Sequence, residues 1–485
     1  MLITNTLMQK IPDGEVEFSP FSIIDDFGKV FFWGGQVFRA INIESVNNVK
    51  MMFTSGLIPH LIEKGLFVDS RMTDYELEGY GLVIQHELAN VVTYPYEWSF
   101  SMLKKAGLMV LDLNKNASKY GYQTKDIHPY NVLFFGLTPK FIDLGSFVLI
   151  SKTSIKYLYT FEEFSRCYFF PLKVWSLGDS YTARRFIQRW KLMAPIDSYV
   201  SYRLGGRIGL LKKQFFNLWK SIYLLQRVRL VYGDLLSVRY QKWSSIFKII
   251  NWLGFPLCIS KINSLEKRLG NLMPLKSYSE WGSYHESLYL YDNKPVLSER
   301  LQKIVEIIIK LNPATVTDIA GNQGVLSQVI AGLDGVDQVT CLDYDDEAID
   351  LGYIRVLNSN LPNKNLHFAV INPFYSETNK FESSPDSRFK SDLVLALALT
   401  HHLALTQSYS LSYIFTAISK YTRKNVAIEF MPLGLFDSIA QKGNPPPDWY
   451  TEEWFTREFE KEFKLIDVVK LEINRILFIG ELINV

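Results

Sequence analysis

From about residue 295 to the end, segments of strand length and of helix length alternate along the chain. The segment "TVTDIAG" (315–321) is dominated by a short apolar run, which is typical of a strand buried on both faces. The segment before it, "RLQKIVEIIIKLNP" (300–313), repeats its apolar residues with helical spacing and ends at a proline. This alternation predicts a parallel sheet with crossover helices.

The alternation continues through the later segments. Strands are expected at 338–345, 366–373, 392–400 and 425–432, and helices at 325–335 and 347–360. The last stretch, 463–484, predicts a closing pair of strands. The expected fold is α/β: a doubly wound, Rossmann-like sheet with an antiparallel closing hairpin.

The first 150 residues follow a different pattern. Two strands are expected around the Gly34-Gly35 turn, then a short helix at 55–65 and a long amphipathic helix at 97–121, then two strands joined by a turn. We therefore expect three zones: an α+β domain at 1–150, a helical, basic connecting region at 151–295 and the α/β domain at 296–485. A hydrophobic content of 48% lets each domain bury a core.

Positive charge is concentrated in the middle of the chain. Fourteen basic residues and two acids lie between Arg184 and Lys248, although the net charge of the whole chain is only +2. The near-neutral total argues against bulk nucleic-acid binding. The cationic, amphipathic segment 207–233 could lie on an anionic bilayer or meet a lipid-linked, phosphate-bearing substrate. It could also be an inter-domain helix with a solvated basic face.

Several features bear on the compartment. The three cysteines are far apart, which predicts neither a zinc site nor a disulfide framework and favours a reducing compartment. The amino terminus lacks the pattern of a secretory signal. The longest apolar stretch, 244–260, is interrupted by Lys248 and Asn251 and is too short for a membrane span. We expect a cytoplasmic protein, which could bind peripherally to the inner face of the membrane through the basic region.

The turn after the first strand of the carboxyl-terminal sheet carries the strongest chemical signal. The segment "VTDIAGNQGVLSQVI" (316–330) places small residues between a buried strand and a helix, where a nucleotide-like ligand could approach free backbone amides. The next strand ends in "CLDYD", and the acid at position 343 could bind both hydroxyls of a ribose. The alternative is that any doubly wound sheet needs small residues at this turn.

These features together resemble the class I S-adenosylmethionine-dependent methyltransferases over about 298–485. The antiparallel closing hairpin is part of the resemblance, because plain dinucleotide dehydrogenases lack it. The resemblance implies that the methionine part of the cofactor lies over Asp318, Ala320 and Gly324, and that its ribose lies on Asp343.

The turn departs from the usual pattern of that family, an acid followed by glycine at every second position. The matching residues here are Asp318, Ala320, Asn322 and Gly324, and Gly321 is out of step. Asparagine can adopt left-handed backbone angles, so it can replace a glycine. All five residues are candidates for cofactor contact.

The strand at 392–400 runs into His401 and His402, at the edge where sites form in open α/β sheets. Methyl transfer to a hydroxyl needs a base near neutral pH, and histidine suits that role. We expect one ring to face the cleft, with His402 favoured, and the other to pack. Glu429, at the end of the next strand, is a second polar candidate. The alternative is that the histidines cap a helix and Glu429 is solvated.

Two further segments are ambiguous. "NPFY" (372–375) resembles the Asn-Pro-Pro-Tyr motif of amino methyltransferases, but it follows the third strand and lacks the second proline. We interpret it as a turn near the adenine, which makes Asn372 a cofactor candidate. The aromatic segment 281–293 could be a lid over the acceptor or a helix that packs on the sheet.

The stretch "TKDIHPYNVLFFGLTPKFIDLGS" (124–146) points to a second type of reaction. Asp126, Asn131 and Asp143 have the spacing of a phosphoryl-transfer loop, and a long helix precedes them. Residues 15–150 therefore resemble the kinases. The resemblance implies that Asp126 accepts the proton of a substrate hydroxyl, and that Asn131 and Asp143 hold Mg²⁺ on ATP. The alternative is a hairpin whose Asp and Asn make side-chain turns.

This segment also departs from the kinase pattern. No glycine-rich loop is visible, and "TKD" replaces His-Arg-Asp. Arg39 stands where a kinase has its phosphate-binding lysine, and the two are not equivalent. Glu63, on the following helix, could pair with Arg39. The domain could phosphorylate a substrate, bind nucleotide without turnover, or act as a scaffold.

The order of the two modules resembles bacterial methyltransferases of the nodulation and cell-surface-glycan type, and bifunctional kinase–methyltransferases that modify bacterial surface polysaccharides. That resemblance implies O-methylation of a glycan or related small-molecule substrate, although a fold alone does not specify a substrate. The alternatives are a small-molecule O-methyltransferase with a non-catalytic amino-terminal binding domain, and a regulatory pseudoenzyme.

Overall fold

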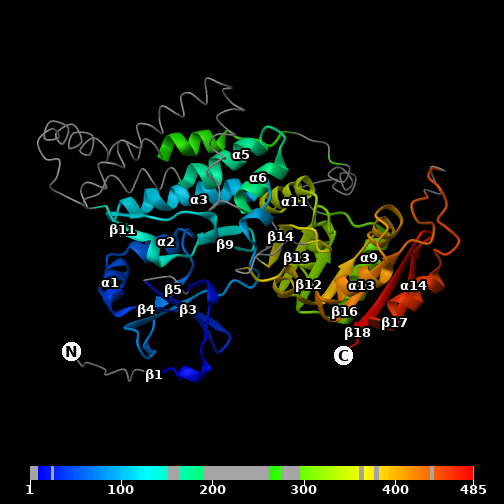
Figure 1. Ribbon diagram of the computed structural model, residues 1–485, viewed down its shortest axis with the longest axis horizontal. Coiled ribbons are helices and arrows are strands. Elements are labelled where there is room, and N and C mark those ends of the chain that lie inside the picture. Colours follow the sequence, from blue (N-terminus) through cyan, green and yellow to red (C-terminus); the bar gives the residue numbers. More distant parts are fainter. Residues whose placement is uncertain are drawn as a thin grey trace, which may run out of the picture. The chain divides into compact units, whose positions relative to one another are not determined.

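The computed structural model describes residues 9–22, 27–150, 163–188, 262–275, 279, 295–359, 365–375, 382–436 and 442–483 (Figure 1). The chain divides into two compact units. The amino-terminal unit comprises 1–88, 103–132 and 139–276, and the carboxyl-terminal unit comprises 89–102, 133–138 and 277–485. Two short segments from the first 150 residues, 89–102 and 133–138, group with the carboxyl-terminal unit. The three expected zones stay a prediction.

The carboxyl-terminal unit is built on a seven-stranded sheet with the order β14-β13-β12-β15-β16-β18-β17, coloured green to red in Figure 1. The strands are β12 (Thr315–Ile319), β13 (Gln338–Asp343), β14 (Leu366–Val370), β15 (Ser391–Ala396), β16 (Thr422–Phe430), β17 (Phe463–Glu472) and β18 (Arg475–Leu482). The first five in this order pair in parallel, and β18 pairs antiparallel with both β16 and β17. The expected doubly wound sheet is present, and its last two strands form an antiparallel hairpin at one edge.

Helices follow the strands as the sequence pattern predicts. They are α9 (Glu299–Leu311), α10 (Val325–Ile330), α11 (Asp346–Asn358), α12 (Pro385–Arg388), α13 (Leu411–Ser419) and α14 (Glu452–Phe459), with a π-helical turn, η10, at His402–Thr406. Ser298 caps α9 and Asp345 caps α11, because their side chains accept backbone N–H groups of the first turn. A core rich in phenylalanine lies between α13, α14 and the hairpin.

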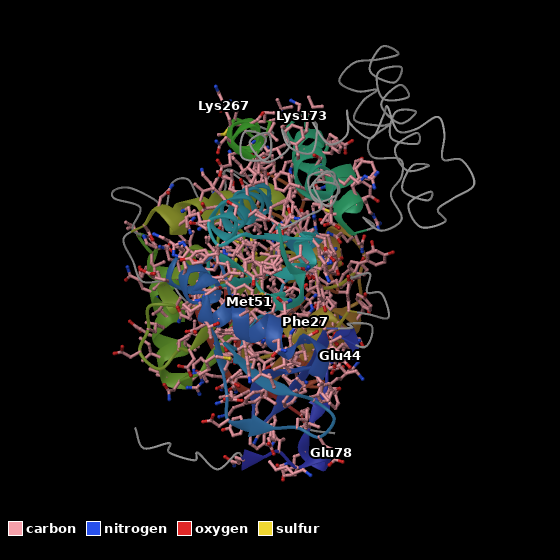
Figure 2. The ribbon with its side chains drawn as sticks, turned by 90° about the vertical axis from the view of Figure 1, so that its left-hand side faces the viewer. Phe27, Glu44, Met51, Glu78, Lys173 and Lys267 are labelled. Carbon is pink, nitrogen blue, oxygen red and sulfur yellow. The ribbon has the colours of Figure 1, made fainter. Side chains whose placement is uncertain are left out.

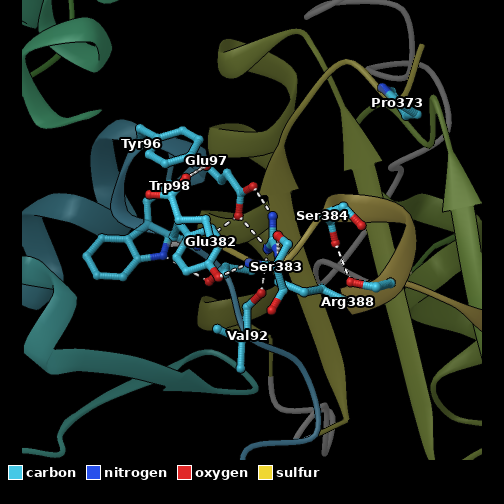
Figure 3. Close-up of polar contacts among 12 residues, drawn as sticks. Val92, Tyr96, Glu97, Trp98, Pro373, Glu382, Ser383, Ser384 and Arg388 are labelled. Atoms are coloured by element: carbon cyan, nitrogen blue, oxygen red, sulfur yellow. Dashed lines mark hydrogen bonds and ion pairs between the residues drawn. The ribbon is translucent and has the colours of Figure 1, made fainter. Parts of the chain in front are cut away.

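Segment 89–102 is fastened to this unit by a buried ion pair (Figure 3). The guanidinium of Arg388 contacts the Glu97 carboxylate through two nitrogens, at 2.5 and 2.9 Å. It also donates to the main-chain oxygens of Val92 and Ser383, and it stacks on the Tyr94 ring at 4.2 Å. A bidentate, buried pair of this kind is strongly directional, so it fixes this short segment on the unit.

The amino-terminal unit contains a five-stranded antiparallel sheet with the order β2-β3-β4-β7-β5. Its strands are β2 (Glu17–Phe18), β3 (Gly28–Trp33), β4 (Gln36–Ile41), β5 (Ser70–Met72) and β7 (Leu82–His86), and short strands β1 (Gln9–Lys10) and β6 (Tyr75–Glu76) pair separately. Helices α1 (Val46–Thr54) and α2 (Leu57–Glu63) lie between β4 and β5 in the sequence. Phe31 and Phe38 stack in its core.

The long helix α3 (Phe100–Ser118) follows, and the expected helix at 97–121 is confirmed with shorter ends. After it, β8 (Tyr122–Thr124) pairs antiparallel with β11 (Phe147–Leu149). Between them, β9 (Val132–Phe135) and β10 (Thr138–Phe141) form a hairpin. Helices α5 (Phe170–Trp175) and α6 (Ser180–Gln188) come next in the chain, and residues 262–270 form a further helix.

Several expectations concern residues outside the described ranges. The cationic segment 207–233, the apolar stretch 244–260 and the aromatic segment 281–293 all lie there. None of the helices in the described part of the chain combines the length and the apolar character that a bilayer crossing requires.

Candidate functional site

The turn between β12 and α10 adopts an unusual backbone at every second residue. Ala320, Asn322 and Gly324 have φ values of 58°, 53° and 64°, in the left-handed region. These are the positions at which the methyltransferase pattern has glycine, so the backbone keeps the pattern although two of the side chains differ. Asparagine tolerates this conformation better than alanine, for which it costs about 1 kcal/mol.

Gly321 is needed for a different reason. A Cβ atom at this position would lie 2.7 Å from Asp318 Oδ2 and 2.8 Å from Cys341 Sγ. Real Cβ atoms do not approach other atoms so closely, so the turn packs against β12 and β13 only because the side chain is absent. The glycine that stands out of step in the sequence is thus a packing requirement.

Four backbone amides of this turn that we expected to be free, those of 321–324, are bonded within the protein. The Gly321 N–H donates to the Leu342 main-chain oxygen at 3.1 Å and the Gly324 N–H donates to the Gly321 oxygen at 2.9 Å. The Gln323 N–H is taken by the Asn322 side chain and the Asn322 N–H by Asp343. Because these donors bond within the protein, any ligand contact here depends on other groups.

Asp343 is the last residue of β13 and accepts two backbone N–H groups. Asn322 donates to Oδ2 at 2.8 Å and Asp345 donates to Oδ1 at 2.9 Å. Burial raises the pKa of Asp343 to about 6, and the two amide hydrogen bonds oppose the shift. A carboxylate offers about four acceptor positions, so this group retains capacity for further donors while the turn holds it in one orientation.

Asp318 lies beneath the turn and not over it. Its side chain is 3% exposed and accepts a hydrogen bond from Ser327 Oγ at 2.6 Å. Burial is the main cause that raises its pKa to about 7, and the charge of Asp343 adds to the shift. The side chain of Asp318 is thus buried and bonded to Ser327 of α10, and its contact with a cofactor stays a prediction.

Asn372 follows β14, at the same edge of the sheet as Asp343, because β13 and β14 are parallel neighbours. Asn372 is exposed, and its side chain accepts the Phe374 N–H at 3.0 Å, which makes a side-chain turn. The turn interpretation of this motif is confirmed. Two exposed tyrosines, Tyr344 and Tyr375, lie beside these positions in the sequence and were missed by sequence reasoning.

The histidine pair lies just beyond β15, where η10 begins. The ring centroids of His401 and His402 are 4.1 Å apart; His401 is buried and His402 is partly buried. Nδ1 of His401 has no hydrogen-bond partner among the described residues. Burial, then the charges of His402 and Arg475, lower the pKa of His401 to about 3, so its ring is neutral near pH 7. The more open His402 is the one that sequence reasoning favoured.

Glu429, the penultimate residue of β16, is fully buried and not solvated. Its carboxylate accepts hydrogen bonds from Arg300 and Arg475 and from the Ala398 N–H. With these partners it is poorly suited to act as a base. Neither arginine was recognised from the sequence, since each lies far from Glu429 along the chain.

In the amino-terminal unit, Asn131 lies beside the segment that carries Asp143. The Asn131 main-chain oxygen accepts the Ile142 N–H at 2.9 Å, and Nδ2 is buried without a partner among the described residues. Asp143 Oδ1 is 3.2 Å from Arg39 Nη1 and also accepts the Gly145 N–H, and Oδ2 accepts the Ser146 hydroxyl. Phe27, labelled in Figure 2, lies against Gly145, where a Cβ would meet it at 3.2 Å.

The prediction of an ion pair between Arg39 and Glu63 was wrong. Glu63 is exposed at the end of α2, and no ion pair joins it to Arg39 in the part of the chain that the structure describes. Arg39 is directed to Asp143 instead. Within the described residues, no group of three or more His, Cys, Asp or Glu side chains is arranged to hold a metal ion.

Asp126 is partly exposed, and His128 Nε2 lies 3.3 Å from its carboxylate. Sequence reasoning missed Glu163, whose carboxylate accepts the Ile127 N–H at 2.8 Å. Burial and then the negative charge of Asp126 raise the pKa of Glu163 to about 7. No pattern in the sequence links positions 126 and 163, so only the tertiary structure identifies this carboxyl pair.

Comparisons with known proteins give one relative and several solved structures of low similarity. No protein-family model matches the sequence. Nodulation protein NoeA of Rhizobium meliloti (strain 1021) is 25% identical over 425 residues, which cover 85% of this chain and 84% of the relative.

Among solved structures, the N-methyltransferase NodS from Bradyrhizobium japonicum WM9 is 11% identical with a TM-score of 0.27, covering 38% of this chain and 96% of that one. Magnesium protoporphyrin IX methyltransferase from Synechocystis PCC 6803 is 12% identical with a TM-score of 0.29, covering 37% and 81%. A methyltransferase from Clostridium acetobutylicum ATCC 824 is 11% identical with a TM-score of 0.30, covering 42% and 96%.

Proposed function

We propose that the carboxyl-terminal unit binds S-adenosylmethionine and transfers its methyl group to an acceptor. The observation that carries the proposal is Asp343: a carboxylate at the end of β13, bonded to the Asn322 amide of the left-handed turn after β12. The sheet order supports it, since the antiparallel β18 beside β16 is the feature that separates methyltransferases from plain dinucleotide-binding sheets.

The residues present fit this cofactor. Asp343 has acceptor capacity for ribose hydroxyls, and Ala320, Gly321 and Gly324 keep much of the turn after β12 free of large side chains. The exposed Asn372 lies at the end of the neighbouring strand and would face the adenine side. Bound there, the cofactor supplies a methyl group activated by a sulfonium.

The proposed acceptor is a hydroxyl group, because a histidine side chain at this edge of the sheet can take its proton. The oxygen of the acceptor forms a bond to the methyl carbon as the carbon–sulfur bond breaks, and the sulfur keeps that electron pair. The proton of the hydroxyl goes to His402, the more open ring of the pair, and then to solvent. Histidine can perform this step near neutral pH.

The proposed substrate is a glycan or a related metabolite, which could be lipid-linked. Support comes from the relative, which is named a nodulation protein, and from the resemblance to methyltransferases of the cell-surface-glycan type. A small-molecule O-methyltransferase with a non-catalytic amino-terminal domain is the second candidate. A regulatory pseudoenzyme is the third, and it predicts that S-adenosylmethionine does not bind.

For the amino-terminal unit we propose a kinase-like module that phosphorylates or binds the same substrate, with ATP and Mg²⁺ as its ligands. A five-stranded antiparallel sheet, the helix α3 and the β8–β11 region in this order support a kinase-like fold. The contact between Arg39 and Asp143 favours nucleotide binding without turnover, because a cation at Asp143 would compete with the guanidinium. The basic region and its membrane contact remain proposals.

The test of the carboxyl-terminal site is calorimetric titration of the full-length protein with S-adenosylmethionine. We expect micromolar affinity, weakened at least about 30-fold by Asp343→Ala, since two hydrogen bonds to a charged group are lost at about 1.5–3 kcal/mol each before relaxation. Asp334→Ala is the matched control, because this exposed carboxylate precedes β13 at the opposite edge. No heat with the wild-type protein would reject the proposal.

The acceptor is sought by mass spectrometry after incubation of cell extract with the protein and isotopically labelled S-adenosylmethionine. A labelled glycan supports the proposed substrate class. Label on a protein or an RNA contradicts it, and label on an unrelated small metabolite favours the second candidate.

A further inference from the structure

Glu429 is the centre of a buried charge cluster where β16 ends. Its carboxylate lies 2.5 Å from Arg300 Nη1 and 3.0 Å from Arg475 Nη1, and both arginine side chains are mostly buried. Arg300 belongs to α9 and Arg475 begins β18, so the cluster joins two other elements to β16. Arg475 also contacts the exposed Glu472 at 3.3 Å. A buried carboxylate with two such partners is firmly held, because losing one leaves buried charge uncompensated.

The same residue holds the loop that follows β15. The Ala398 N–H donates to Glu429 Oε2 at 2.9 Å, and the Thr400 hydroxyl donates to the Glu429 main-chain oxygen at 2.8 Å. Ala398 has a φ of 49°, which is unfavourable for a residue with a side chain by about 1 kcal/mol. A hydrogen bond to a carboxylate is about twice as strong as a neutral one and can offset that cost. The conformation of the loop thus depends on Glu429.

His401 and His402 follow this loop directly, at the start of the π-helical turn. Because Thr400 is buried and bonded to β16, the chain enters η10 from a fixed point. The buried ring of His401 then lies against the ring of His402. Two contacts therefore determine the orientation of the His402 ring. One is the loop 398–400, which is bonded to Glu429. The other is the neighbouring ring of His401, which follows the same loop.

We propose that Arg300, Glu429 and Arg475 are positioning residues that orient His402 toward the acceptor hydroxyl through the loop 398–400. The catalytic role of these three residues rests on the proposed methyl transfer. Their effect on the histidines can be measured without any acceptor. Glu429 thereby acts through His402 and does not itself take the proton.

The test uses the full-length protein with ¹³C-labelled histidine, followed by NMR as a function of pH. The chain has seven histidines, and His402→Gln assigns the relevant signal. We expect Glu429→Gln to move the His402 signal and to lower its pKa by about half a unit or more, because Arg300 and Arg475 both lose the negative charge of Glu429. The charge that acts on the pair from outside it is that of Arg475, which is bonded to Glu429 and Glu472, and Arg300 shares Glu429 with it.

Glu472→Gln is the matched control, since it removes a carboxylate from the same arginine but touches neither the loop nor β16. We expect it to leave the His402 signal and pKa unchanged. A merely structural role for Glu429 would lower stability without moving the pKa of His402. Equal titration curves for the wild-type protein and Glu429→Gln would overturn the proposal.

Thr400→Val is the second variant, in case Glu429→Gln does not fold. It removes one hydrogen bond to Glu429 and leaves the ion pairs intact. We expect the His402 signal to move while the pKa of His402 stays close to the wild-type value, because the loop loosens without a change of charge. An unchanged His402 signal in this variant would contradict a positioning role for the loop.

Transfer is measured with labelled S-adenosylmethionine and cell extract at a saturating donor concentration. We expect Glu429→Gln to slow the incorporation of label about 10- to 100-fold, with the dissociation constant of the donor unchanged by calorimetry. If the wild-type protein binds no donor, the proposed function fails and the NMR result stands on its own. If the donor binds and the variant transfers at the wild-type rate, the positioning proposal fails.

Discussion

Asp343 in the carboxyl-terminal unit and Asp143 in the amino-terminal unit each lie at or just beyond the end of a strand, yet their partners differ. Asp343 accepts neutral backbone amides from Asn322 and Asp345. Asp143 is paired with the guanidinium of Arg39. Amides orient a carboxylate and leave its charge available, whereas an arginine neutralises it. Asp343 can therefore accept ligand hydroxyls, and any cation at Asp143 has to displace Arg39.

The comparison implies that carboxylates held by arginine matter most for stability. The pair of Arg388 and Glu97 should show it best, because both of its side chains are almost fully buried. Replacing Arg388 with Met should lower the unfolding free energy of the carboxyl-terminal unit by about 3–5 kcal/mol, because Glu97 would remain buried without its counter-charge. Denaturant unfolding followed by circular dichroism measures this loss. Arg423→Met is the control, since its contact with Asp392 is 3.7 Å long and exposed. Equal losses in both variants would contradict the comparison.

The Arg39→Met variant separates the two roles at Asp143. We expect a smaller loss of stability, about 2 kcal/mol, because the Asp143 side chain is 21% exposed and keeps two other donors. We also expect Mg²⁺ to bind more tightly than to the wild-type protein, which titration with the metal alone would measure. The exposed Arg71→Met on β5 serves as the control. Unchanged Mg²⁺ affinity would show that Arg39 does not block the carboxylate.

At Asp343 the comparison predicts a pH dependence of donor binding. Burial raises the pKa of this group to about 6, so at pH 5 the carboxyl is mostly protonated and at pH 7 mostly charged. We expect S-adenosylmethionine to bind about tenfold more weakly at pH 5 than at pH 7. Asp343→Asn should bind weakly and show little of this dependence. The same slope in the variant would assign the titration to another group.

The raised pKa values also make stability depend on pH, and in the opposite direction to donor binding. The folded-state pKa values of Asp343 and Asp318 are raised, to about 6 and about 7, so the folded protein binds protons before the unfolded chain does. Their contribution to stability is full below the unfolded value near 4 and is lost as the pH rises through 6 to 7. His401, with its pKa lowered to about 3, acts in the other direction between pH 6.5 and 3.

The smallest effect concerns the backbone of the turn that supports Asp343. Ala320→Gly should raise stability by about 0.5 kcal/mol, because glycine adopts a φ of 58° without strain but adds freedom to the unfolded chain. Ala331→Gly is the matched control, since Ala331 has a φ of −63° and should lose about 0.5–1 kcal/mol. Thermal unfolding of both variants measures the difference. Destabilisation by Ala320→Gly would show that the methyl group has a packing role.

The sequence alone predicted the sheet, its crossover helices and the acid at position 343. The pattern of apolar residues along the chain determines these features. A buried parallel strand needs a continuous apolar run, and a crossover helix needs an apolar stripe. It also placed the histidine pair at the edge of the sheet and the turn at 320–324. These features depend on neighbours along the chain, which a single sequence displays.

The tertiary structure decided what each polar residue contacts. It placed 89–102 on the carboxyl-terminal unit through Arg388, directed Arg39 to Asp143 and not to Glu63, and surrounded Glu429 with arginines 129 and 46 positions away. It also gave the backbone amides of 321–324 hydrogen-bond acceptors within the protein. Ion pairs and hydrogen bonds are short-ranged in space and unrelated to separation along the chain, so no local pattern of residue types encodes them.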